Sequence, residues 1–156
     1  MRQLLGSELA VRPLASAGPD DEPKCELLRA GAPTGCQVFG AVLEAAILWN
    51  DRTLLFMTDG IPYEDFLTIH LFDDRLSPLD SASIGTMFST GSFSLLRLDE
   101  PNRVVFRFIG DTAWTVELLE QPVLQLPLLG DPPGVQRRLR LQRHFRLHTQ
   151  PRHQAA

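Results

Sequence analysis

Residues 38–58 read VFGAVLEAAILWNDRTLLFMT, which is two apolar runs separated by the turn pair Asn50-Asp51. Apolar runs on either side of a two-residue turn predict two β-strands joined as a hairpin. Because both runs are apolar throughout, with Glu44 the only charge before the turn, we expect these strands to be covered on both faces. A helix is the alternative for the first run, since it contains two adjacent alanines.

Further short runs follow the first two, each ended by turn residues. Residues 66–72 alternate, so that Leu67, Ile69 and Leu71 share one face and the residues between them share the other. Pro78 falls inside the next run and predicts an edge strand there. Turns every eight to twelve residues or so are typical of all-β domains. We therefore predict an all-β fold, an antiparallel β-sandwich or open barrel with meander connections and about eight to ten strands.

Length and composition indicate one ordinary globular unit. The chain has 156 residues, of which 44% are hydrophobic and 22% charged. We predict a single β domain over residues 1–148 and a flexible C-terminal tail over residues 149–156. No apolar run approaches the roughly 20 residues that span a bilayer, and the first residues lack a secretory apolar region. A cytoplasmic location without membrane contact is the expectation, with Cys25 and Cys36 as free thiols.

Charge is distributed unevenly along the chain. All 19 acidic residues lie at or before Asp131, and the residues after it carry six arginines. From residue 138 to residue 148 polar and apolar positions alternate, with Arg143 as the exception, which predicts a last strand with a basic face that includes Arg138, Arg140 and Arg146. Such a face can bind nucleic acid or an acidic protein, or pair with acids of the same chain. The acidic body argues against nucleic acid as the partner.

One acidic loop and the strand after it form the main candidate site. It contains Asp59, Tyr63, Glu64, Asp65 and His70. Carboxylates near a histidine can transfer protons or hold a divalent metal, and the same residues can contact a ligand or partner. The alternative is a solvated loop with turn-forming residues. No calcium-loop spacing and no second nearby histidine are present, so we assign no metal, cofactor or catalytic residue.

Two further features of the sequence are candidates for ligand binding. The glycine- and hydroxyl-containing stretch 85–92 precedes a β-type run rather than a helix, which argues against a phosphate loop. Five aromatic residues are expected to form core, with a ligand pocket as the alternative; they are Trp49, Phe56, Phe106, Phe108 and Trp114.

No nucleophile motif such as G-x-S-x-G occurs in the chain. We therefore predict a non-enzymatic accessory module that binds another protein through loops or edge strands. It should show an exposed apolar patch or an unpaired strand edge. A small-ligand β-barrel is one alternative, with an enclosed cavity around Trp49 and Trp114. A metal-dependent or hydrolytic enzyme is the other, with the acidic loop and His70 converging within hydrogen-bonding distance.

Overall fold

The protein is built from antiparallel strands, and a computed structural model describes residues 1–16, 18–61, 64–85, 91–126, 130–137 and 141–150. This part of the chain contains no helix, which confirms the predicted all-β class. The strands are β1 (Arg2–Gln3), β2 (Leu9–Pro13), β3 (Lys24–Arg29), β4 (Ala32–Phe39), β5 (Val42–Trp49), β6 (Arg52–Thr58), β7 (Leu67–Phe72), β8 (Pro78–Ile84), β9 (Ser94–Asp99), β10 (Arg103–Arg107), β11 (Ala113–Leu124), β12 (Val135–Gln136) and β13 (Gln142–Gln150).

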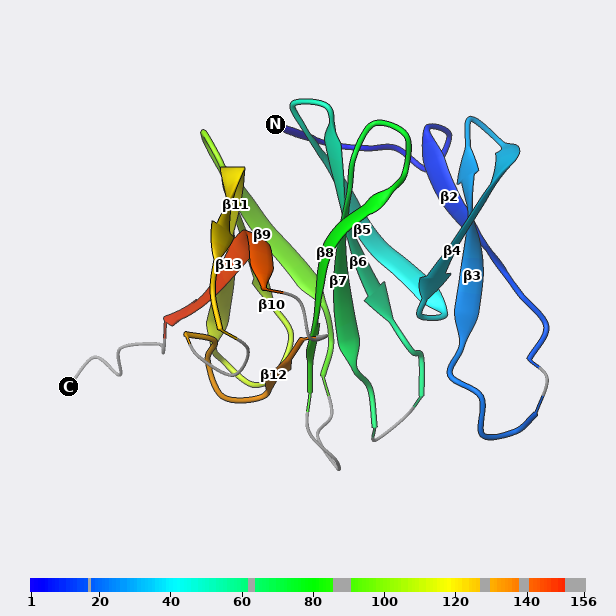
Figure 1. The fold of residues 1–156 in the computed structure, drawn as a ribbon. Helices are drawn as coiled ribbons and strands as arrows, with labels where there is room; N and C mark the ends of the chain where they lie inside the picture. Colours follow the sequence, from blue (N-terminus) through cyan, green and yellow to red (C-terminus); the bar gives the residue numbers. More distant parts are fainter. Residues whose placement is uncertain (17, 62–63, 86–90, 127–129, 138–140, 151–156) are drawn as a thin grey trace.

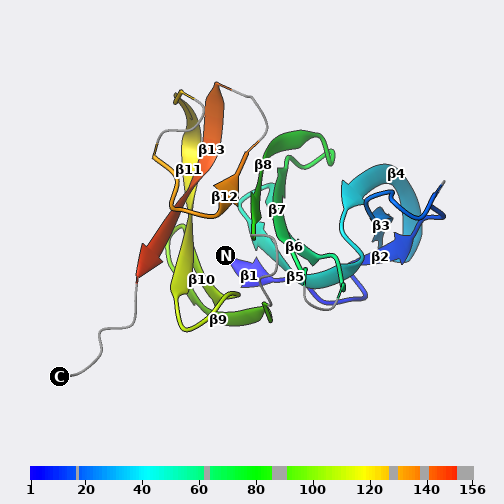
Figure 2. The same cartoon turned by 90° about the horizontal axis from the view of Figure 1, so that it is seen from below.

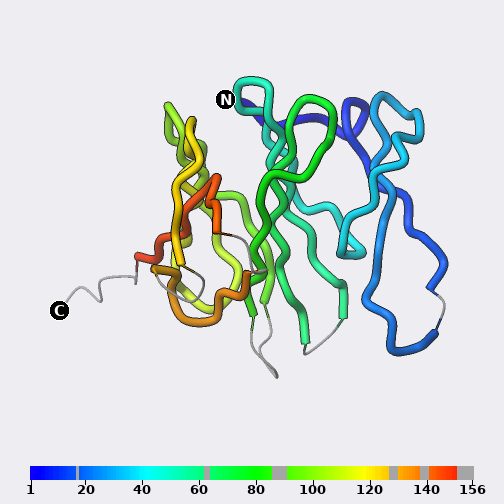
Figure 3. Tube along the Cα trace, viewed as in Figure 1, coloured from blue at the N-terminus to red at the C-terminus, as the bar shows by residue number. Residues whose placement is uncertain are grey.

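These strands form three sheets, and the six-stranded one lies between the other two (Figures 1 and 2). Its order is β1-β5-β6-β7-β8-β12, whereas the flanking sheets are β13-β11-β10-β9 and β2-β3-β4. The chain crosses between layers, as its trace shows in Figure 3. The thirteen strands in the described residues exceed the predicted eight to ten, because the N-terminal region adds a sheet of its own and two short strands extend the central sheet.

Strand β6 shows why the apolar runs fold as they do. Leu54 and Phe56 belong to the core between the central and four-stranded sheets, whereas Leu55 and Met57 belong to the core between the central and three-stranded sheets. All four side chains are 0% exposed. The expectation of a strand covered on both faces is confirmed, and its partner β5 is a strand rather than a helix.

The first apolar run is divided between two sheets. Strand β4 ends at Phe39, and the chain then passes through Gly40 and Ala41 into β5. Gly40 has a φ of +122°, and a Cβ atom at this position would lie 2.6 Å from the Cβ of Met57. Glycine therefore lets the connection between layers press against the core, at a backbone angle that other residues rarely adopt.

The aromatic residues form core, as predicted. All five are buried in the cluster between the central and four-stranded sheets. The ring centroids of Phe56 and Phe106 are 5.1 Å apart, in an edge-to-face arrangement. Trp49 donates its indole N–H to the carbonyl oxygen of Pro101 at 2.9 Å. The tryptophans therefore lie within the packed core rather than on the outer faces of the sheets.

A buried ionic network joins β8 of the central sheet to β13 of the four-stranded sheet. One carboxylate oxygen of Asp80 accepts hydrogen bonds from Arg137 at 3.2 Å and from the backbone N–H of His144 at 2.8 Å. Arg137 also donates to the carbonyl oxygen of Phe145 and to Asp131, at 2.9 Å each, and lies over the Phe145 ring. Side chains thus hold the two sheets together at this seam.

The C-terminal strand was predicted, but its boundary differs. Strand β13 extends to Gln150, past the expected boundary at residue 148, and the rest of the expected tail lies outside the described residues. Strand β11 also continues through Pro122, with an irregularity in its pairing between Leu118 and Val123. Cys25 and Cys36 are free, as predicted. None of the described residues form a helix able to cross a membrane.

Candidate functional site

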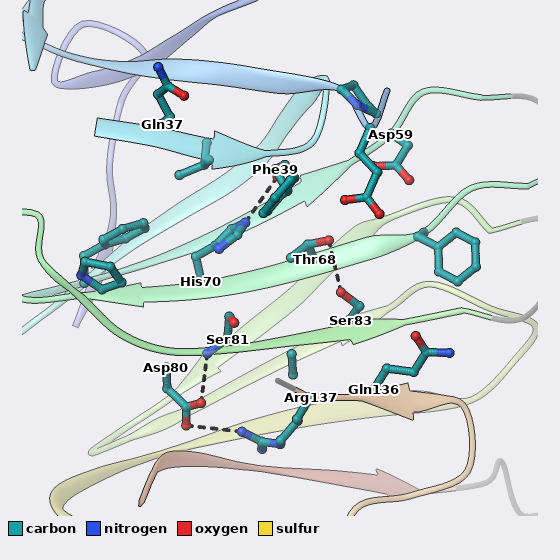
Figure 4. Close-up of a pocket in the computed structure, with 17 residues that line it drawn as sticks. Gln37, Phe39, Asp59, Thr68, His70, Asp80, Ser81, Ser83, Gln136 and Arg137 are labelled. Carbon is teal, nitrogen blue, oxygen red and sulfur yellow. Dashed lines mark hydrogen bonds and ion pairs between the residues drawn. The ribbon is translucent and has the colours of Figure 1, made fainter. Parts of the chain in front are cut away.

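A groove of about 500 Å³ lies between β4 and the outer face of β7 and β8 (Figure 4). The three-stranded sheet packs mainly on β5 and β6, whose outer positions are apolar. The outer positions of β7 and β8 that line the groove are different in character, because most are polar; they are Thr68, His70, Phe72, Ser81 and Ser83. The opposite wall comes from β4, which contributes Gln37, Val38 and Phe39.

His70 and a pair of hydroxyls define the middle of the groove. The ring Nε2 of His70 lies 3.2 Å from the carbonyl oxygen of Phe39. A carbonyl oxygen can only accept, so Nε2 carries the hydrogen and donates it. This bond connects β7 to β4 across the groove. Next to it, the hydroxyl oxygens of Thr68 and Ser83 are 3.3 Å apart, as direct neighbours on β7 and β8.

Aromatic rings flank these polar groups. Phe39, Phe66 and Phe72 all line the groove, and Phe72 stacks on His70 with ring centroids 6.0 Å apart. The Phe66 ring packs against the backbone of Gly85, where a Cβ atom would lie 2.5 Å from a ring carbon. A glycine after β8 therefore fixes the position of this ring, and the groove combines apolar surfaces with hydroxyl and imidazole groups.

One end of the groove is acidic. Glu22, from the β2–β3 connection, and Asp59, directly after β6, both line it. Asp65 accepts the backbone N–H groups of Asp59 and Gly60, at 3.0 and 3.3 Å, and so shapes the loop. Burial raises the pKa of Asp59 from its ordinary value of 3.8 to about 6, and the negative charges of Asp65 and Glu22 act in the same direction.

The structure brings together part of the acidic site predicted from the sequence. Asp59 and His70 line the same groove, and Asp65 supports the backbone of Asp59. Glu64 is exposed and does not line the groove, and Tyr63 lies outside the described residues. In the described part of the chain, no group of three or more His, Cys, Asp or Glu side chains is placed to hold a metal ion.

Sequence reasoning missed the residues that form most of the groove. Thr68 stood on the face of β7 that the alternation marks as opposite to the core, so its outward direction was predictable. Ser81 and Ser83 were not singled out, because the run containing them is only weakly alternating. Gln37 and Phe39 gave no signal at all, because the placement of β4 opposite β7 depends on contacts between residues distant in sequence.

The predicted basic face is partly described. Arg146 lies 4.0 Å from Glu117, and His148 and Arg103 approach the same carboxylate at 3.1 and 3.6 Å. Arg138 and Arg140 lie outside the described residues, as do residues 86–90 of the glycine-containing stretch. Where it is described, the basic strand therefore pairs with an acid of the same chain.

Three leucines at one end of the four-stranded sheet are exposed. Leu124, Leu126 and Leu141 are 80%, 63% and 59% exposed, near the end of β11 and the start of β13. The chain continues from Leu141 into β13, and the backbone N–H of Gln125 bonds the carbonyl oxygen of Leu141 at 2.8 Å. Because Leu124 pairs with Gln142, the neighbouring Leu141 lies on the opposite side of the sheet from Leu124, and the three leucines do not form one apolar patch.

Replacing Asp59 by asparagine is expected to stabilise the fold by about 1 kcal/mol at neutral pH, after allowance for the solvent screening of a half-buried group. In the unfolded chain this carboxyl ionises near its ordinary pKa of 3.8, whereas in the folded chain it ionises near 6. The wild-type protein thus loses stability relative to the variant as pH rises through that interval. Urea unfolding at about pH 7.5 and about pH 4 measures the difference. A variant less stable than wild type at the higher pH would contradict this account.

Comparison with known proteins finds no matching family model, no similar curated protein and no similar solved structure. The inference of function therefore starts from the groove itself. Its open shape, its mixed polar and aromatic walls and its acidic end are the properties that a ligand or partner would meet.

Proposed function

We propose that this protein is a non-enzymatic recognition module that binds an extended, basic segment of a partner protein in the groove. The observation that carries the proposal is the groove between β4 and the outer face of β7 and β8, where the three-stranded sheet leaves Thr68, Ser81 and Ser83 only half-buried. On β5 and β6 the same outer face is apolar and covered. The outer face of the central sheet thus changes from apolar to mostly polar where the groove begins.

The walls of the groove suit an extended polypeptide. Ser81 and Ser83 are two residues apart on β8, which separates their side chains by about 7 Å along the strand. Thr68 and His70 repeat the same spacing on β7. An extended chain presents its side chains with the same period, and hydroxyl groups can accept from or donate to its backbone. Phe39 and Phe66 offer apolar contact beside these groups.

The acidic end specifies a basic segment. Asp59 and Glu22 meet there, and the raised pKa of Asp59 shows that its negative charge is unfavourable in the protein alone. A charge that costs folding free energy is not explained by stability, and such groups are concentrated at functional sites. A lysine or arginine side chain of the partner would neutralise it through a charge-assisted hydrogen bond.

The two other candidate functions have less support from the geometry. The Nε2 hydrogen of His70 is donated to the carbonyl oxygen of Phe39, so this ring nitrogen links β7 to β4. A small-ligand barrel would require Trp49 and Trp114 to line a cavity. Both instead pack in the core between the sheets and do not line the groove. We also propose a cytoplasmic location, where reducing conditions keep thiols such as Cys25 and Cys36 unpaired.

Selection from a phage-displayed library of random peptides of about seven residues tests the proposal. We expect enrichment of peptides with lysine or arginine at a fixed position. The variant Asp59→Asn should bind an enriched peptide about 10- to 100-fold more weakly, because a partly desolvated ion pair is lost. The matched control is Asp51→Asn, which removes the same charge from an exposed turn residue outside the groove.

The stability prediction for Asp59 sharpens this experiment. Since Asp59→Asn is expected to be more stable than wild type at neutral pH, weaker binding by this variant would not reflect unfolding. Failure to enrich any peptide, or equal affinity of Asp59→Asn and Asp51→Asn for the enriched peptide, would refute the proposed function.

A further inference from the structure

We infer that the partner segment binds by adding a strand to the outer edge of β4, which would extend the three-stranded sheet to four strands. This inference rests on the proposed function and specifies how the segment is held. Three observations carry it: the position of β4 in its sheet, the direction of its backbone groups and the place that a neighbouring strand would occupy.

Strand β4 is an end strand, because the sheet order is β2-β3-β4. Its backbone direction can be read from two hydrogen bonds. The carbonyl oxygen of Phe39 accepts from His70 across the groove, so it points away from β3. Lys24, the partner of Phe39 on β3, directs its carbonyl oxygen to the backbone N–H of Leu14 on the far side. Both bonds show that this pair does not exchange ladder hydrogen bonds.

The same direction holds two residues earlier. Antiparallel pairs alternate between those that exchange ladder hydrogen bonds and those that do not. The pair Gln37–Glu26 lies two positions from Phe39–Lys24, so it exchanges no ladder hydrogen bonds either. The backbone N–H and C=O of Gln37 therefore point to the groove side of β4. Beyond it, Gly35 donates its N–H to the side chain of Glu26 at 3.0 Å. The edge offered to a partner is thus short and centred on Gln37.

A strand added here would lie over the uncovered part of the central sheet. The three-stranded and six-stranded sheets face each other (Figure 2), and β4 lies across the groove from β7 and β8. Neighbouring strands in a sheet are about 4.8 Å apart, so the next strand after β4 would continue the outer layer across the groove. Its inward side chains would then meet the row formed by Thr68, Ser81 and Ser83.

The two edges of the four-stranded sheet carry protection against added strands. On β9 the register shifts opposite Val105 and Phe106, and Arg97 and Asp99 form an exposed ion pair. On β13 the side chains of Asp80 and Arg137 bond backbone groups of the strand. Bulges and charged side chains are the usual ways in which proteins block an edge. The centre of the β4 edge instead carries an uncharged residue, Gln37.

An N-methyl scan of a peptide enriched on the protein tests strand addition. N-methylation removes one backbone donor at a time and leaves the side chains in place. We expect affinity to fall by about 10-fold or more at alternate residues, those that face β4, and to change less than about threefold at the residues between them. Uniform tolerance, or losses without alternation, would overturn the inference.

Two variants of Gln37 place the added strand on β4. Gln37→Pro removes the outward N–H and no ladder bond, and proline is tolerated on edge strands. It should weaken binding of the enriched peptide by about 10-fold more than Gln37→Ala, which removes the same side chain but keeps the backbone N–H. Equal binding by both variants would overturn the inference. Should Gln37→Pro fail to fold, the peptide scan alone decides.

The outcomes separate this inference from the function on which it rests. A peptide that depends on Asp59 but tolerates every N-methylation would leave the proposed function standing and show that strand addition is wrong. Absence of any enriched peptide would overturn both.

Discussion

Replacing Arg137 by methionine is expected to lower the free energy of unfolding by about 3–5 kcal/mol. The Arg137 and Asp80 side chains are only 4% and 2% exposed, and the arginine bonds two carboxylates and the carbonyl oxygen of Phe145. Methionine fills similar space over the Phe145 ring but leaves the buried charge of Asp80 without its cation. The cost of an uncompensated buried charge dominates the effect.

Urea denaturation followed by circular dichroism measures this loss. The matched control is Arg97→Met, which removes an arginine from the exposed pair with Asp99 and should cost less than about 1 kcal/mol. Similar effects of the two substitutions would contradict the role given to the buried network in joining β8 to β13.

Truncation of Phe106 to alanine is expected to destabilise the fold by about 3–5 kcal/mol. Phe106 is 0% exposed, and its ring centroid lies 5.1 Å from that of Phe56 and 5.7 Å from that of Phe93. The substitution removes these contacts and opens a cavity between the central and four-stranded sheets, where rigid neighbours on both sides limit collapse.

The urea midpoint, with an unchanged dependence on urea concentration, reports this loss. Leu126→Ala serves as the control, because its side chain is 63% exposed and should change stability by less than about 0.5 kcal/mol. A loss below about 1 kcal/mol for Phe106→Ala would mean that the two sheets do not pack as described.

Local pattern was sufficient to predict the central strands β6 and β7. The continuous apolar run in β6 requires cover on both faces, and the alternation in β7 assigns Leu67, Ile69 and Leu71 to the core. These signals depend only on neighbouring residues and their burial. The division of the first run at Gly40 was not predicted, because an apolar sequence does not show which of two layers each half enters.

Contacts between distant residues were beyond the sequence. Asp80 and Arg137 are 57 positions apart, and nothing near either one indicates the other. Arg143 broke the alternation of the last strand, yet its side chain is buried on the core face. Polar residues in such positions depend on partners that only the folded chain supplies.

The candidate site, too, was predicted only in part from the sequence. Asp59 and His70 were selected because acids and histidine are chemically versatile, and both line the groove. Glu64 belonged to the same acidic cluster in sequence but is exposed and lies outside the groove lining. The groove itself arises where the three-stranded sheet ends over β7 and β8, which is a property of three layers packed together.

Backbone amide chemical shifts of the labelled protein, measured while an enriched basic peptide is added, test the central claim most directly. The account predicts that the largest changes fall on Gln37 of β4, Thr68 of β7 and Ser83 of β8. The chemical shifts of amides in the four-stranded sheet, such as that of Glu117, should not change. The account would be contradicted if the changes were concentrated in the four-stranded sheet, or around the exposed Leu124 of β11, while β4 and β7 showed none.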